Sequence, residues 1–151
     1  MLKCQKYYIR FPRYSGVDGR ITGVTIAVRN QDKALEYYTS KVGFEKKTDY
    51  YPSPSYRHLT VSPKGQDLEL ALWQLGTPDP RGISSEWRPG SNPPITIRVE
   101  DCRKAFEEMK SRGVQFRQAK PEEYFWGISA MFSDPDGNLF WIVQHTGKAP
   151  W

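Results

Sequence analysis

Several features of common protein classes are missing from this sequence. Only two cysteines are present, Cys4 and Cys102, so a disulfide framework is not expected and a reducing, cytoplasmic location is. The longest apolar run, 139–143, has five residues and is too short to cross a membrane. The first residues contain no apolar stretch of the length that a secretory signal needs. We therefore expect a cytoplasmic protein that does not interact with membranes.

Acidic residues are scarce at one end of the chain. The 151 residues carry a formal net charge of +5, and residues 1–20 hold five basic side chains against Asp18 alone. The rest of the chain is nearly neutral, with 17 basic and 16 acidic side chains. A nucleic-acid-binding domain needs basic residues along its binding surface. This distribution argues against nucleic acid as a partner of the main domain and marks residues 1–19 as a separate basic extension.

An internal repeat is the main positive feature. Residues 24–41 align without a gap onto 95–112, and seven of the 18 positions are identical. Each copy begins with alternating apolar residues, as in a strand, and continues with a helical apolar period. Asn30 and Asp101 stand where the two helices need N-caps. The repeat therefore predicts two modules that share one fold.

Strand-like segments follow each helix. In the first copy they are 56–63 and 67–74, and in the second 126–133 and 138–144. Between the last two lies DPDG, whose Pro, Asp and Gly favour a hairpin turn.

The intervening residues 76–92 are rich in Pro and Gly, which predicts a linker. We expect a single α+β domain over 20–147, built from modules of about 20–75 and 93–147. Each module would contain a strand, a helix and two or three further strands.

The segments VTIAVRNQDKALEYYTSKVGF, ITIRVEDCRKAFEEMKSRGV and DPDGNLFWIVQ resemble the vicinal oxygen chelate superfamily. This superfamily includes glyoxalase I, bleomycin resistance proteins and extradiol dioxygenases. The resemblance covers roughly residues 21–145. It implies paired βαβββ modules with mixed, curled sheets around a cavity, and a homodimer.

The resemblance also implies positions for a metal. Metal-using members have a His at the start of the first strand of each module, and a Glu in the fourth strand and in the closing strand. At these positions this sequence has Gly23, Pro94, Glu69 and Trp141. Only Glu69 has a ligand-type side chain, whereas a divalent transition metal needs three or four ligands. We therefore expect no metal and no other cofactor.

Alternation within the strands predicts two faces. The apolar set expected under the helices is Val24, Ile26, Val28, Leu59, Val61, Leu68, Leu70, Leu72, Ile95, Ile97, Val99, Phe140 and Ile142. The opposite set mixes aromatic, small and polar residues, as ligand pockets do. From it we predict six ligand-binding residues: His58, Glu69, Trp73, Thr96, Met131 and Trp141.

The leading prediction is a metal-free protein that binds or sequesters a small planar organic molecule, in the manner of resistance proteins. Trp73 and Trp141 would stack on it, and His58, Glu69 and Thr96 would supply polar contacts. Enzymatic activity stays open. His58 is the candidate general base, although it is also compatible with a half-exposed strand residue. Glu69 is also compatible with an ion pair to Arg98.

The alternative function is a metal-dependent lyase, isomerase or dioxygenase of the glyoxalase type. It would require relocated ligands such as His58, Glu69 and His145, the last expected just beyond the final strand. A third possibility is a nucleic-acid-binding or partner-binding role of the basic extension.

Overall fold

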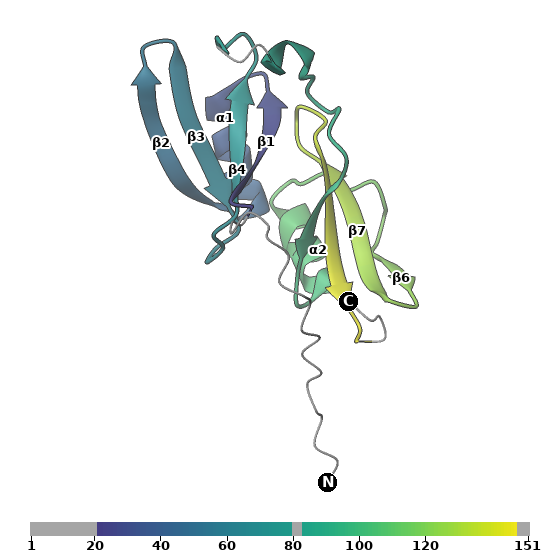
Figure 1. The fold of residues 1–151 in the computed structure, drawn as a ribbon. Coiled ribbons are helices and arrows are strands. Elements are labelled where there is room, and N and C mark those ends of the chain that lie inside the picture. The colour runs from purple at the N-terminus through teal and green to yellow at the C-terminus, as the bar shows by residue number, and fades with distance from the viewer. Residues whose placement is uncertain (1–20, 80–82, 148–151) are drawn as a thin grey trace, which may run out of the picture.

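The structure, a computed structural model, describes residues 21–79 and 83–147 (Figure 1). Module 1 consists of β1 (Gly23–Val28), α1 (Gln31–Glu36), η1 (Tyr37–Val42), β2 (Glu45–Ser53), β3 (Tyr56–Ser62) and β4 (Glu69–Gln74). Module 2 consists of β5 (Ile95–Arg98), α2 (Cys102–Ser111), β6 (Glu122–Tyr124), β7 (Gly127–Ser133) and β8 (Leu139–His145). A short 3₁₀ helix, η2 (Ile83–Glu86), lies between them. The predicted extension 1–19 falls outside the described residues.

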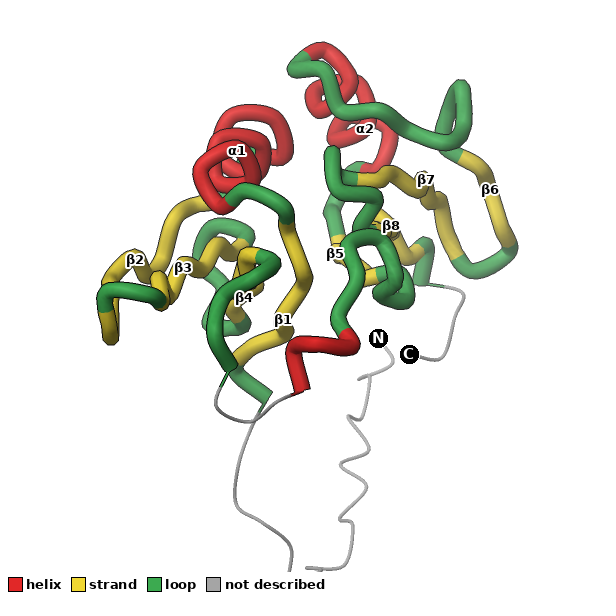
Figure 2. Tube along the Cα trace, turned by 90° about the horizontal axis from the view of Figure 1, so that it is seen from above, coloured by secondary structure: helices red, strands yellow, loops and turns green. Residues whose placement is uncertain are grey.

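Both modules use the same sheet topology, which confirms the predicted α+β class of paired βαβββ units. The strand orders are β1-β4-β3-β2 and β5-β8-β7-β6. In each sheet the first and last strands of the module pair in parallel and the other pairs are antiparallel. Figure 2 shows both helices on the same side of the sheets, with β1 and β5 as neighbouring inner edges. Among the described residues the sheets stay open and do not close into a barrel.

The outer strands β2 and β6 were not among the segments predicted individually. Nearly all of their residues are exposed, and their sequences, EKKTDYYPS and EEY, are largely polar. Outer strands need little apolar surface, so they lack the alternation that identifies a half-buried strand. Each helix is therefore followed by three strands.

The helices begin at the predicted caps. The Asn30 side chain accepts a hydrogen bond from the Lys33 backbone N–H at 2.9 Å, and Asp101 accepts one from Lys104 at 2.9 Å. The first helix then widens into the π-helical η1. This wider turn buries both Tyr37 and Tyr38, whereas a regular helical period predicts only the second of these as a core residue. None of the described helices is long and apolar enough to cross a membrane.

Most of the predicted apolar set forms the core under the helices. Eight of its members are buried: Ile26, Val28, Leu59, Val61, Leu70, Leu72, Phe140 and Ile142. Ile95, Ile97 and Val99 are partly buried against this core. The prediction was wrong for Val24, which is 37% exposed, and Leu68, which is 40% exposed. Val24 lies in the half of β1 that the core does not cover, and Leu68 precedes β4.

The turn DPDG and the following Asn138 join the two modules. Tyr38 Oη donates to Asp134 Oδ2 at 2.6 Å, and both side chains are buried. Asn138 Nδ2 donates to the Ala27 carbonyl at 2.9 Å, and the Arg29 guanidinium lies 2.9 Å from Asp136. The predicted hairpin turn is therefore also the contact that ties module 2 to the end of β1.

Candidate functional site

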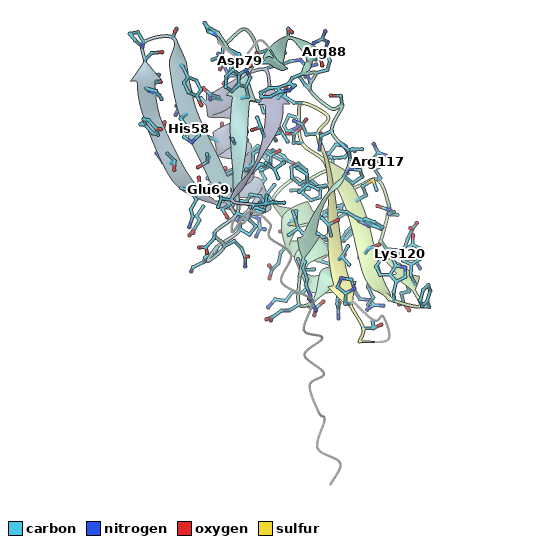
Figure 3. All side chains as sticks on the ribbon, viewed as in Figure 1. His58, Glu69, Asp79, Arg88, Arg117 and Lys120 are labelled. Atoms are coloured by element: carbon cyan, nitrogen blue, oxygen red, sulfur yellow. The ribbon has the colours of Figure 1, made fainter. Side chains whose placement is uncertain are left out.

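The six predicted ligand-binding residues lie on the sheet faces opposite the helices. We call this face of the module 1 sheet face 1. It carries His58 and Glu69, which Figure 3 labels, and Trp73, which follows Glu69 on β4. Face 2 is the corresponding face of module 2. Strand alternation assigns these side chains, because their neighbours Leu59, Leu70 and Leu72 are buried in the helix-side core.

One end of face 1 is an aromatic cluster around Trp73. The centroid of its ring system lies 5.3 Å from that of Tyr56 and 5.3 Å from that of Trp87, whose plane is nearly perpendicular. His58 is next, with its Nδ1 at 2.9 Å from Tyr56 Oη and its ring 5.4 Å from the Tyr50 ring. We call these five residues the face 1 aromatic cluster. Tyr50 and Trp87 were not predicted, because they come from an unpredicted strand and from the linker.

The other end of face 1 is polar. The half-buried Glu69 accepts hydrogen bonds at Oε2 from Thr60 Oγ1 at 2.5 Å and from Thr48 Oγ1 at 3.4 Å. Thr60 also accepts a bond from the Thr48 backbone N–H at 3.1 Å. The ion pair with Arg98 that the sequence also allowed is not found among the described residues; two hydroxyls bind this carboxylate instead.

Small side chains separate the two ends of face 1. The β-sheet register places Gly23 beside Glu69, Thr25 beside Ala71, and Ala27 beside Trp73. Ala71 also pairs with Thr60 across the sheet. The surface of face 1 between its aromatic and polar ends therefore carries only short side chains.

On face 2, three of the predicted residues form one row. Register pairs Thr96 with Trp141 and Trp141 with Met131, so the row crosses β5, β8 and β7. Trp126 packs edge-on against Trp141, with ring centroids 5.8 Å apart, and stacks in parallel on Tyr124 at 5.0 Å. Trp126 therefore packs on Trp141 in face 2 much as Trp87 packs on Trp73 in face 1.

Two further residues at the edge of face 2 have defined environments. His145 is the last residue of β8, paired with Gly127, so the expectation that it lies beyond the final strand was wrong. Its ring centroid is 6.2 Å from that of Trp126. The Tyr124 hydroxyl donates to Glu122 at 2.6 Å, and this hydrogen bond raises the pKa of Tyr124.

The two faces do not form one enclosed pocket within the described residues. Instead, a cleft of about 670 Å³ lies between the modules, lined by residues that include Val24, Leu70 and Ile97. Thr96 is among its lining residues, whereas the other five predicted residues lie outside it. Strand alternation thus distributes the six predicted residues over two faces, which a single chain keeps apart.

The positions that the family resemblance assigns to a metal do not fit one. Gly23 is beside Glu69 in the sheet, but Gly23, Pro94 and Trp141 provide no acceptor atom in their side chains. Glu69 is engaged by two threonines. Among the described residues, no three His, Cys, Asp or Glu side chains come together as a relocated ligand set would. This donor set cannot hold a divalent transition metal.

Comparison with known proteins agrees with this architecture. YetH of Bacillus subtilis, described as uncharacterized, is 34% identical over 125 residues, which cover 83% of this chain and 98% of YetH. A crystal structure of a superfamily member from Sphaerobacter thermophilus is similar with a TM-score of 0.73 and 34% identity, covering 84% of this chain and 98% of that one. TnmS3, an antibiotic binding protein from Streptomyces sp. CB03234, matches with a TM-score of 0.68 and 32% identity over 85% of this chain and 97% of its own.

A family model covers nearly the whole described domain. The model matches residues 20–142, from just before β1 into β8. With the repeated βαβββ topology and the DPDG turn between β7 and β8, this match establishes that the chain belongs to the Glyoxalase/Bleomycin resistance protein/Dioxygenase superfamily.

Proposed function

We propose that this protein binds a small planar organic molecule on face 1, without a metal ion. The face 1 aromatic cluster is the observation that carries this proposal. Trp73, Tyr56 and His58 are only half-buried and Tyr50 is exposed, so ring surface remains available to a ligand. Flat aromatic surfaces beside a few hydrogen-bonding groups are typical of sites for planar ligands.

The comparisons support a binding role at the level of ligand class. TnmS3 is an antibiotic binding protein and shares 32% of its sequence with this chain. We extend from it only the binding of a small organic molecule, with sequestration as the biological consequence. The Thr96–Trp141–Met131 row on face 2 is the second surface of the proposed site. Because faces 1 and 2 are separate in one chain, we also propose a homodimer, which sedimentation analysis would test.

Fluorescence titration would test the proposed function. Planar aromatic probes, such as anthraquinones and acridines, should quench the tryptophan emission of the full chain, and Trp73→Leu should weaken their binding about tenfold. Tyr51→Leu is the matched control, because Tyr51 lies against Arg57 and away from the face 1 aromatic cluster. Chelation with EDTA should leave affinity unchanged.

Three outcomes would contradict this function. Binding that is lost on removal of a stoichiometric metal would overturn the metal-free proposal and favour a metal-dependent enzyme. Binding that responds to Ile97→Asn, in the cleft between the modules, but not to Trp73→Leu would place the site in the cleft. No binding by any planar probe would overturn the ligand class.

A further inference from the structure

Glu69 has an environment that the proposed stacking function does not explain. It is half-buried on face 1, and its two described side-chain partners, Thr60 and Thr48, both donate to the same oxygen, Oε2. The other carboxylate oxygen has no described partner. A carboxylate in such a partly desolvated place is best stabilised by charge-assisted hydrogen bonds.

No counter-ion is provided for Glu69 by the described part of the chain. None of the described ion pairs includes it. The two lysines of the outer strand β2, which also carries Thr48, are engaged elsewhere, since Lys46 pairs with Asp49 and Lys47 pairs with Glu45. Face 1 thus presents a negative charge that the described residues leave uncompensated.

The distance from this charge to the stacking surface is set by one strand. Glu69 and Trp73 both belong to β4 and are four residues apart, which is about 13 Å at the usual rise of a strand. Figure 3 shows His58 and Glu69 at different heights along the module 1 sheet, in agreement with this separation. Between the two ends lie the small side chains of Thr25 and Ala71, which leave a path across the sheet.

We propose that Glu69 selects ligands that carry an ammonium or other cationic N–H group at a distance from their planar ring system. The rings would stack in the face 1 aromatic cluster, and the cation would bind the free oxygen of Glu69. This inference rests on the proposed function and specifies its ligand class as an elongated, cationic aromatic molecule. The same position that the family resemblance assigns to a metal ligand would then hold the ligand's own positive charge.

Matched probes would test the selection. Anthraquinones with an alkyl tail of graded length, ending in an ammonium, a hydroxyl or a carboxylate, differ only at the group that would reach Glu69. The ammonium series should bind about tenfold tighter than the hydroxyl series at the best tail length, since hydrogen bonds to charged groups are the stronger class. The carboxylate series should bind most weakly.

Variants locate the effect at Glu69. Glu69→Gln keeps an oxygen for Thr60 and should abolish the ammonium preference, so that the ammonium and hydroxyl probes bind with similar affinity. Glu36→Gln removes one negative charge from the exposed surface of α1 and should change nothing. An ammonium preference that survives Glu69→Gln, or one that is absent from the wild type while all probes bind, would overturn this inference and leave the proposed function intact. Failure of every probe to bind would instead overturn the proposed function, together with the inference that rests on it.

Discussion

The two modules arise from one repeated pattern, yet their two sheet faces differ in kind. On the helix side both have a capped helix over a buried apolar layer and the same strand order. On the opposite side, face 1 has the aromatic cluster and the carboxylate of Glu69, whereas face 2 has the Thr96–Trp141–Met131 row without a carboxylate in it. The two copies of the repeat thus share their helix-side core and differ in the sheet faces that a ligand would contact.

This difference follows from what each side contributes to stability. Helix-side residues are buried, so a change of one methylene there costs free energy and limits variation. The six predicted ligand-binding residues on the opposite faces are half-buried or exposed, so changes there should cost less stability. A face that is free to vary is where two copies of one module can acquire different binding properties.

The largest expected effect is a loss of stability on truncating side chains at equivalent helix positions of the two modules. Phe106 in α2 is fully buried and packs on Phe116 with ring centroids 4.3 Å apart, whereas its repeat counterpart Leu35 is only half-buried. Phe106→Ala should lower the free energy of unfolding by about 3–5 kcal/mol, against about 1–2 kcal/mol for Leu35→Ala. Urea unfolding would measure both. Equal losses would show that the two helices are equally packed, contrary to the structure.

The next effect concerns the contact that joins the modules. Asn138 is buried, donates to Ala27 of the other module and accepts from the Gly90 N–H at 3.0 Å. Asn138→Ala would leave these buried groups unpaired and should cost about 2–3 kcal/mol. The control Asn92→Ala removes a half-buried amide that donates to the carbonyls of Pro93 and Leu139, both in module 2. If the control matched Asn138→Ala in urea unfolding, the junction would have no special role.

Part of the protein's sensitivity to alkaline pH should come from Tyr38 of module 1. Burial and the nearby Asp134 raise the pKa of Tyr38, whereas its repeat counterpart Met109 does not ionise. An unfolded tyrosine ionises near pH ~10. Stability from the neutral Tyr38 is therefore complete below that pH and lost above it, as the unfolded state releases its proton.

Tyr38→Phe should make the loss of stability above pH ~10 less steep and cost about 1–2 kcal/mol at neutral pH. Unfolding midpoints from pH 7 to 11 would measure this. The slope should not vanish, because burial also raises the pKa of Tyr37. An unchanged slope would mean that Tyr38 ionises in the native state.

The smallest expected effect concerns the ion pairs that connect each helix with the outer strand of its sheet. In module 1, Arg57 bonds both Asp49 on β2 and Asp32 on α1, and its side chain is 15% exposed. In module 2, the exposed Arg103 of α2 pairs with Glu123 of β6. The hydrogen bond from Arg57 lowers the pKa of Asp49 to about 2.

Because the folded pKa of Asp49 lies below its unfolded value, its contribution is present above pH ~4 and lost as the pH falls toward 2. Asp49→Asn should cost under about 1 kcal/mol at pH 7, and Glu123→Gln less, since exposed pairs contribute little. Thermal unfolding of both variants at pH 7 and pH 3 would measure this. If Glu123→Gln lost more stability than Asp49→Asn, the ion pair of module 2 would be the stronger one, contrary to this prediction.

Much of the fold could be predicted because its signals are local. The caps Asn30 and Asp101, the DPDG turn and the strand alternation act within a few residues. The outer strands β2 and β6 were missed because exposed polar strands carry no periodic signal. Tyr37 was missed because the π-helical widening of η1 shifts it toward the core, and a regular helical period does not include such a shift.

Less of the candidate site could be predicted. Strand parity placed His58 and Trp73 on one face, but Tyr50 and Trp87 join them from an unpredicted strand and a linker. The partners of Glu69 could not be predicted either. Thr48 and Thr60 lie on other strands and contact Glu69 only because the strands pair in one sheet. Which of the six predicted residues act on a ligand stays a prediction.

By itself, the sequence determined the repeat, the α+β class, the turn and the lack of donor atoms at Gly23, Pro94 and Trp141, because these depend on residue type and short spacing. Only the tertiary structure decided that the predicted ligand-binding residues lie on two separate faces, and that Glu69 bonds threonines rather than Arg98. These outcomes depend on how the sheets pair and how the modules join at Asn138. Such long-range arrangements minimise the free energy of the whole chain, which no local pattern of residues specifies.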